Sequence, residues 1–154
     1  MMGKSKVVIV EDLSQMVEAL ELFPKPKKKV VLKPNLISTK KPPTTTPYDI
    51  IEALAKYYIE MGCKIIVAEG SGWCETFKAY KELGYLKLKE FGVKLIDLNE
   101  DGFEVVKNQS ALFLKQFEFP LTLKNAYIVS VPVLRTFYNK SNPFFEEHAW
   151  RNYW

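Results

Sequence analysis

The sequence predicts an α/β fold. Between residues 7 and 97, short runs of β-branched and aliphatic residues alternate with segments of helical periodicity, a pattern typical of βαβ units. After residue 100 the alternation stops, and two extended segments follow each other directly. We therefore expect a three-layer fold with a mostly parallel central sheet, helices on both faces and a small antiparallel excursion near 103–119.

The first strand is expected at Val7–Val10, a run of aliphatic residues. An amphipathic helix follows over 13–23, because apolar residues recur there at helical spacing. Asp12 offers a side-chain cap, and Gln15 completes a capping-box pattern. Pro24 ends the helix.

The second strand is expected at 30–33, where Pro34 removes a backbone donor and stops the ladder. Thr46 and Pro47 suit the cap and the first position of the next helix. Gly62 ends that helix, whose apolar face is formed by Ile50, Ile51, Leu54, Tyr58 and Met61.

The remaining elements follow the same rules of apolar runs, periodicity and glycine stops. In order they are a strand at 64–68, a helix at 74–83 closed by Gly84, a short helix at 85–91, a strand at 93–97, extended segments at Phe103–Lys107 and Leu112–Phe119, and a strand at Tyr127–Val131.

Composition narrows the functional classes. The net charge of the 154-residue chain is +4, and almost all the positive charge is lysine, which argues against nucleic acid as a partner. No apolar run approaches the roughly 20 residues that span a bilayer, and residues 1–6 have no apolar leader, so we expect a cytoplasmic protein without a membrane partner. Its lysine and glutamate content is typical of heat-adapted proteins.

Polar residues cluster where the predicted strands end. Because parallel strands bring their following loops to one edge of the sheet, and open α/β sheets bind ligands there, we expect a site for a small anionic or phosphorylated ligand. Lysine, arginine, amide and hydroxyl groups suit such a ligand, and the glycine loop after residue 69 lets the backbone approach it. The candidate ligand-binding residues are Lys33, Asn35, Thr46, Glu69, Ser71, Arg135 and Thr136.

Each candidate also has an ordinary interpretation. Lys33 and Glu69 could form a structural ion pair, and Glu69 could instead hold a cation. Asn35 could cap its own loop, and Ser71 could belong to a plain tight turn. Cys74 lies near a helix start, but no histidine is close in sequence to activate it, so an idle thiol is the simpler interpretation.

Several segments in a fixed order carry a family resemblance that covers roughly residues 5–136: Val31–Leu36, Thr45–Pro47, Gly62, Val67–Gly72, Thr76, Gly84–Tyr85, Val93–Asp97 and Val129–Thr136. With these motifs the chain resembles the prokaryotic family called domain of unknown function 362. Many of its members carry a ferredoxin-like segment that binds iron–sulfur clusters, which suggests redox work. This chain has only Cys63 and Cys74, so no cluster is expected, and cofactor, metal and catalytic residues stay unassigned.

The chain departs from the family pattern after the last predicted strand. Family-like sequences have a histidine after the Lys-Thr pair, whereas this chain has Arg135, Thr136 and Phe137. It therefore looks like the front half of a larger domain, with a single α/β domain at 1–136 and an aromatic-rich tail at 137–154 that packs on the domain or on a partner. A shifted reading frame, a natural short form that completes its core by pairing with another copy, and a separately encoded second half all remain open. Because a half-domain exposes apolar surface, we expect a homo-oligomer, and specifically a two-fold symmetric homodimer.

Two functions compete at this point. One is ligand binding at the sheet edge in a possibly redox-linked family. The alternative is a non-catalytic truncated remnant or an assembly protein.

Overall fold

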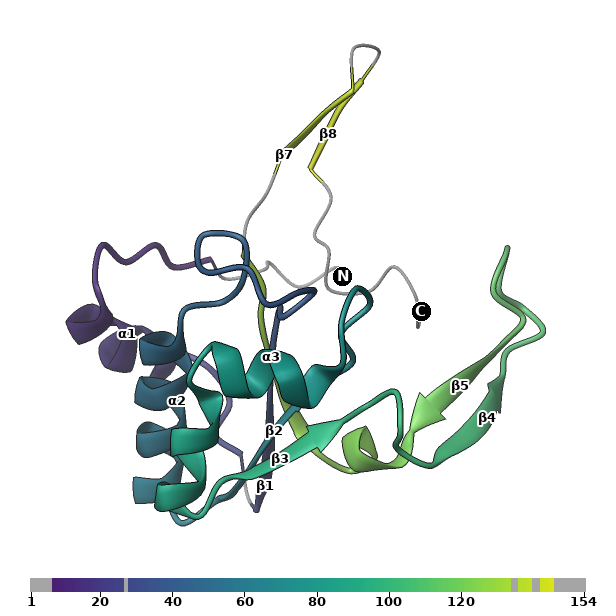
Figure 1. The fold of residues 1–154 in the computed structure, drawn as a ribbon. Helices are drawn as coiled ribbons and strands as arrows, with labels where there is room; N and C mark the ends of the chain where they lie inside the picture. The colour runs from purple at the N-terminus through teal and green to yellow at the C-terminus, as the bar shows by residue number, and fades with distance from the viewer. Residues whose placement is uncertain (1–6, 27, 134–135, 140–141, 146–154) are drawn as a thin grey trace.

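The computed structural model describes residues 7–26, 28–133, 136–139 and 142–145. Its elements follow in chain order (Figure 1): α1 Leu13–Leu20, β1 Lys29–Pro34, α2 Tyr48–Glu60, β2 Lys64–Glu69, α3 Thr76–Glu82, the 3-10 helix η1 Tyr85–Phe91, β3 Lys94–Asp97, β4 Phe103–Lys107, β5 Gln116–Pro120, the 3-10 helix η2 Leu121–Leu123, β6 Tyr127–Val131, β7 Thr136–Asn139 and β8 Asn142–Phe145. The α/β fold expected from the sequence is confirmed.

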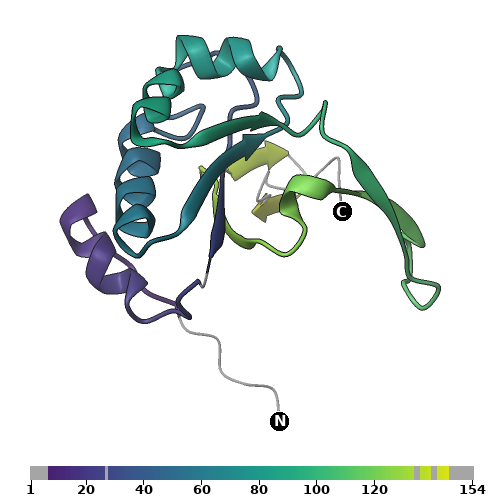
Figure 2. The same cartoon turned by 90° about the horizontal axis from the view of Figure 1, so that it is seen from below.

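Four parallel strands form the central sheet in the order β3-β2-β1-β6. The carboxyl ends of all four strands therefore lie at one edge, called here the carboxyl edge, and their first residues lie at the opposite, amino edge. The antiparallel excursion is also confirmed: β4 pairs with β5, and Figures 1 and 2 show this hairpin reaching away from the sheet. A second antiparallel hairpin joins β7 and β8.

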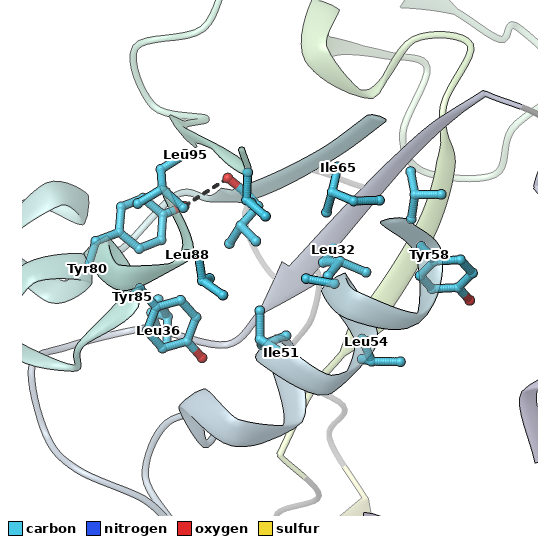
Figure 3. Packing of buried hydrophobic residues seen from close by; sticks show 14 of the residues in the cluster. Leu32, Leu36, Ile51, Leu54, Tyr58, Ile65, Tyr80, Tyr85, Leu88 and Leu95 are labelled. Carbon is cyan, nitrogen blue, oxygen red and sulfur yellow. Dashed lines mark hydrogen bonds between the residues drawn. The ribbon is translucent and has the colours of Figure 1, made fainter. Parts of the chain in front are cut away.

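The main core lies between the sheet and the helices α2, α3 and η1, on what we call the helix side (Figure 3). Alternate strand residues such as Leu32 and Ile65 point to this side, where they meet Ile51 and Leu54 of α2. Tyr80 and Tyr85 are fully buried there, and the Tyr80 hydroxyl donates to the Ile96 carbonyl at 2.8 Å. The polar atoms that these large rings bring into the core are thus paired.

The second face of the sheet is covered differently. A smaller cluster of Val31, Ala68, Leu98 and Leu123 packs there, with half-buried Ile66, Ile96, Phe119 and Ile128 around it. Among the described residues, the helical cover of this face is η2, a single 3-10 turn. The large helices therefore lie on one side and the short turn lies on the other.

The strand expected at Val7–Val10 is wrong. Among the described residues these positions join no sheet, and Val7 and Ile9 are 81% and 91% exposed. The physical reason lies in the topology, because β1 has β2 on one side and β6, which comes from far along the chain, on the other.

Two helix boundaries also differ from the sequence prediction. The helix expected at 13–23 ends at Leu20, and the helix expected at 74–83 is shortened to Thr76–Glu82. Asp12 caps the first helix as expected, because its carboxylate accepts from the backbone N–H groups of Ser14 and Gln15 at 2.8 and 3.2 Å.

The predicted cap of α2 is wrong. Pro47 occupies the N-cap position, so the N-cap residue supplies no side-chain hydrogen bond to this helix. The Thr46 hydroxyl instead forms hydrogen bonds with Asn35, just after β1, and with Val131, the last residue of β6. Gly62 ends α2 as expected, with a φ of +78° that an L side chain rarely adopts.

The described part of the chain contains no helix with the length and hydrophobicity that a bilayer crossing requires. Residues 140–141 and 146–154 of the predicted aromatic tail lie outside the described residues.

Candidate functional site

A buried ion pair joins two neighbouring strands at the carboxyl edge. Lys33 is the penultimate residue of β1, Glu69 is the last residue of β2, and their Nζ and Oε2 atoms are 2.9 Å apart. The two side chains are only 11% and 8% exposed. The pairing that was an ordinary alternative for these residues therefore exists in the structure, in a region where water screens little of the attraction.

Burial and the neighbouring groups shift the pKa of the Glu69 carboxyl in opposite directions. Burial raises its pKa above the ordinary value, and the Asp97 carboxylate on the next strand raises it further. The Lys33 ammonium and the Gly70 backbone N–H lower it, without cancelling the effect of burial. This carboxyl consequently binds a proton more readily than an exposed glutamate does.

Thr46 links the chain just after β1 to the end of β6 through hydrogen bonds. Its Oγ1 accepts from the Asn35 backbone N–H at 2.8 Å and donates to the Val131 carbonyl of β6 at 2.7 Å. Its backbone N–H donates to the Asn35 carbonyl, and its own carbonyl accepts from the buried Tyr85 hydroxyl at 2.8 Å. Thr46 is 2% exposed, so its hydroxyl is used within the protein.

Asn35 carries an unusual polar atom. The residue is 5% exposed, and its backbone N–H and carbonyl are both paired with Thr46. Its side-chain Nδ2 is buried and has no hydrogen-bond partner among the residues that the structure describes. A buried donor without an acceptor costs roughly 1–3 kcal/mol, and such groups in native proteins call for an explanation.

Ser71 lies at the same edge but turns inward. Its Oγ donates to the Leu36 carbonyl at 2.5 Å, and its backbone N–H donates to Thr76 Oγ1 at 3.0 Å. The Trp73 N–H also donates to the Ile37 carbonyl, so the loops after β1 and β2 are bonded to each other. These loops converge as the sequence predicts, but the Ser71 hydroxyl is used to hold them together.

The remaining two predicted site residues are not placed. Arg135 lies outside the described residues, and Thr136 begins β7 without a described side chain. The structure thus brings together Lys33, Glu69, Asn35, Thr46 and Ser71.

Sequence reasoning missed Asn99, which lies just after β3 at the same edge. Its Nδ2 donates to the Ser71 carbonyl at 3.1 Å, and its Oδ1 lies where a Cβ on residue 70 would come within 2.8 Å. A side chain at position 70 would therefore push the Asn99 amide away from its place. The polar residues after the predicted strand at 93–97 were the available signal, since that strand ends at the same edge.

A hollow of about 480 Å³ adjoins this edge beside β3. Cys74, Glu75, Asp97 and Glu100 contribute to its lining, so its character is acidic, and none of the predicted site residues that the structure describes lines it. Among the residues that the structure describes, no three histidine, cysteine or carboxylate side chains are grouped to hold a metal ion.

The parallel sheet and its polar carboxyl edge define an α/β protein with a candidate binding site at the end of β1 and β2. The chain belongs to the family described as Domain of unknown function (DUF362), whose family model matches residues 30–137. The family resemblance drawn from the sequence is thereby confirmed. No match was found among curated proteins or among solved structures.

Proposed function

We propose that the carboxyl edge of the sheet binds a small anionic ligand, with the Asn35 amide as its principal donor. The supporting observation is the buried Asn35 Nδ2, which has no partner within the described part of the chain. Two N–H groups held in place and shielded from water are ready to donate, and a charged acceptor would make those bonds stronger than neutral ones.

Lys33 lies two residues before Asn35 and supplies positive charge to the same edge. Its ammonium has three N–H groups and bonds the Glu69 carboxylate. Because burial raises the Glu69 pKa, this carboxyl takes up a proton more easily than an exposed one, which leaves more of the Lys33 charge to an approaching anion. The proposed site therefore favours anions more strongly as the pH falls.

The test is a titration with inorganic phosphate, followed by the NMR signal of the Asn35 side-chain amide. We expect a saturable shift of that signal. Asn35→Leu should weaken phosphate binding about tenfold or more, because a hydrogen bond to a charged group is lost. Its free energy of unfolding should stay the same or rise, because the variant removes an unpaired buried donor.

The combination of effects is what distinguishes a ligand role from a structural one. An Asn35 amide signal that does not move with phosphate would refute the proposal, as would unchanged phosphate binding by Asn35→Leu. A marked loss of stability in this variant would instead assign the amide a structural role.

A second candidate is an assembly protein that associates with its own copies. The observation that favours it is the tip of the β4–β5 hairpin, where Leu112 and Phe113 are 89% and 94% exposed, and Phe103 and Val105 on β4 are half exposed. Exposed apolar groups so far from the core are typical of interfaces, and a symmetric homodimer is the commonest assembly.

Sedimentation analysis across micromolar concentrations tests this second candidate. We expect a dimer that Leu112→Ser with Phe113→Ser converts to a monomer. Trp73→Ser is the control, because Trp73 is a similarly exposed apolar residue on a different loop. A monomeric wild-type protein over the whole range would contradict self-association.

A further inference from the structure

Three adjacent strands of the sheet begin with the same residue type. Lys29 opens β1, Lys64 opens β2 and Lys94 opens β3. Lys29 and Lys64 are direct neighbours in the strand register, and the Lys64 N–H donates to the Lys28 carbonyl at 2.8 Å. Because parallel strands start at one edge, these four lysines gather at the amino edge, which is the lower edge of the sheet in Figure 1.

Strand alternation sets the direction of these side chains. The residues that follow Lys29, Lys64 and Lys94 are Val30, Ile65 and Leu95, and all three belong to the core on the helix side. The lysine side chains therefore leave from the second face, which the large helices do not cover.

A hollow of about 690 Å³ lies among these lysines, called here the lysine pocket. Lys28, Lys29, Lys64 and Lys94 all line it, and none of the described aspartates or glutamates does. Its remaining lining is largely apolar and includes Ile59, Ile65, Ile66 and Phe91. The pocket thus combines positive charge at its rim with apolar surface, the combination that small-molecule sites use for orientation and for affinity.

The lysines of the pocket form no ion pair with a described carboxylate. Lys29 is anchored, because its Nζ donates to the Thr122 and Lys124 carbonyls at 3.1 and 2.7 Å. Lys28, Lys64 and Lys94 have no carboxylate within 4.0 Å among the described residues, as is also the case for other lysines such as Lys40, Lys81 and Lys107. Positive charge is therefore concentrated at the pocket without a counter-charge from these residues.

Protection of an exposed sheet edge does not account for the lysines. Charged residues on edge strands prevent pairing with other chains, but β1 and β2 are interior strands with a neighbour on both sides. Lys29 and Lys64 thus lie where no such protection is needed.

We propose that the lysine pocket binds a phosphorylated small molecule that carries an apolar or aromatic group. A phosphate monoester is largely a dianion at neutral pH and suits ammonium groups, which bind phosphate as point charges. Its apolar part would lie against Ile66, which is on the same face of the sheet as the lysine side chains and is the register neighbour of Lys94. This site goes beyond the proposed function, because it lies at the opposite edge of the sheet and shares no residue with it.

The test is an NMR titration of the whole chain with phenyl phosphate and, separately, with inorganic phosphate. Gly62 and Gly92 line the pocket, so their backbone amide signals report its occupancy. We expect both signals to shift saturably, with phenyl phosphate binding more tightly than inorganic phosphate because it also covers apolar surface.

Two double variants with the same net charge distinguish binding in the pocket from general electrostatic attraction of the phosphate to a basic protein. Lys64→Gln with Lys94→Gln should weaken phenyl phosphate binding about fivefold for each lysine removed. The control, Lys81→Gln with Lys107→Gln, removes the same charge from exposed positions on α3 and β4 and should leave binding within about twofold.

Either of two results would overturn the lysine pocket: Gly62 and Gly92 signals that do not shift saturably, or equal weakening by the two pairs of substitutions. Asn35→Leu should not affect this titration, so failure here and failure of the carboxyl-edge site are separate outcomes.

Discussion

Replacement of Lys33 by methionine is expected to destabilise the protein by about 3–5 kcal/mol at neutral pH. The substitution keeps most of the side-chain volume but leaves the Glu69 carboxylate without its cation in a site where it is 8% exposed. A buried charge without a partner loses its hydration and gains nothing in return. Urea denaturation of the variant and the wild-type protein measures the difference.

The loss of unfolding free energy caused by Lys33→Met should depend on pH. The direction of this dependence follows from the raised pKa of Glu69. Burial raises the pKa of Glu69 above its ordinary value of 4.5, and loss of the opposing Lys33 charge raises it further. Between 4.5 and the raised value, the folded state holds a proton that the unfolded state has released, so stability falls as the pH rises through this window. The variant should therefore lose more stability than the wild-type protein does as the pH rises, and the cost should shrink near pH 4.5.

Two controls isolate this effect. Asp12 and Glu21 have lowered pKa values, but they keep their partners in the variant, so their contributions cancel in the difference. Replacing both partners, Lys33→Met with Glu69→Leu, should restore most of the stability, because an apolar pair of similar size needs no neutralisation. A cost of Lys33→Met that is the same at every pH would contradict the assignment of the effect to Glu69.

Thr46→Val is expected to have the second largest effect. Valine has nearly the same shape but lacks the hydroxyl, so the Asn35 N–H loses its acceptor and the Val131 carbonyl loses its donor. Each buried group left unpaired costs about 1–3 kcal/mol. The loss should appear as a lower urea midpoint with an unchanged denaturant slope.

Thr46→Ser is the matched control for this prediction. Serine keeps the hydroxyl and removes one methyl group, so it should recover most of the stability that valine loses. Equal destabilisation by serine and valine would show that the methyl group, and not the two hydrogen bonds, is what position 46 contributes.

The sequence was sufficient to predict where the candidate site lies, but not which of its polar groups bond each other. Parallel strands end at one edge, so the sequence alone placed Lys33, Asn35, Glu69 and Ser71 together, and the structure brings them there. The distinction between a polar group that is already paired and one that is not depends on distances of a few ångströms. The structure pairs Lys33 with Glu69, uses the Ser71 hydroxyl within the fold and gives the Asn35 Nδ2 atom no partner among the described residues.

Local patterns in the sequence determined most of the elements of this protein. Apolar runs, helical spacing and glycine or proline stops identify the strands of the parallel sheet, its helices and the β4–β5 hairpin, because backbone preferences and side-chain periodicity act over a few residues. Tertiary structure decided the rest. The aliphatic run Val7–Val10 pairs with no described strand, while β6 reaches back from far along the chain to lie beside β1, because strand pairing is a competition between distant segments that no local pattern records.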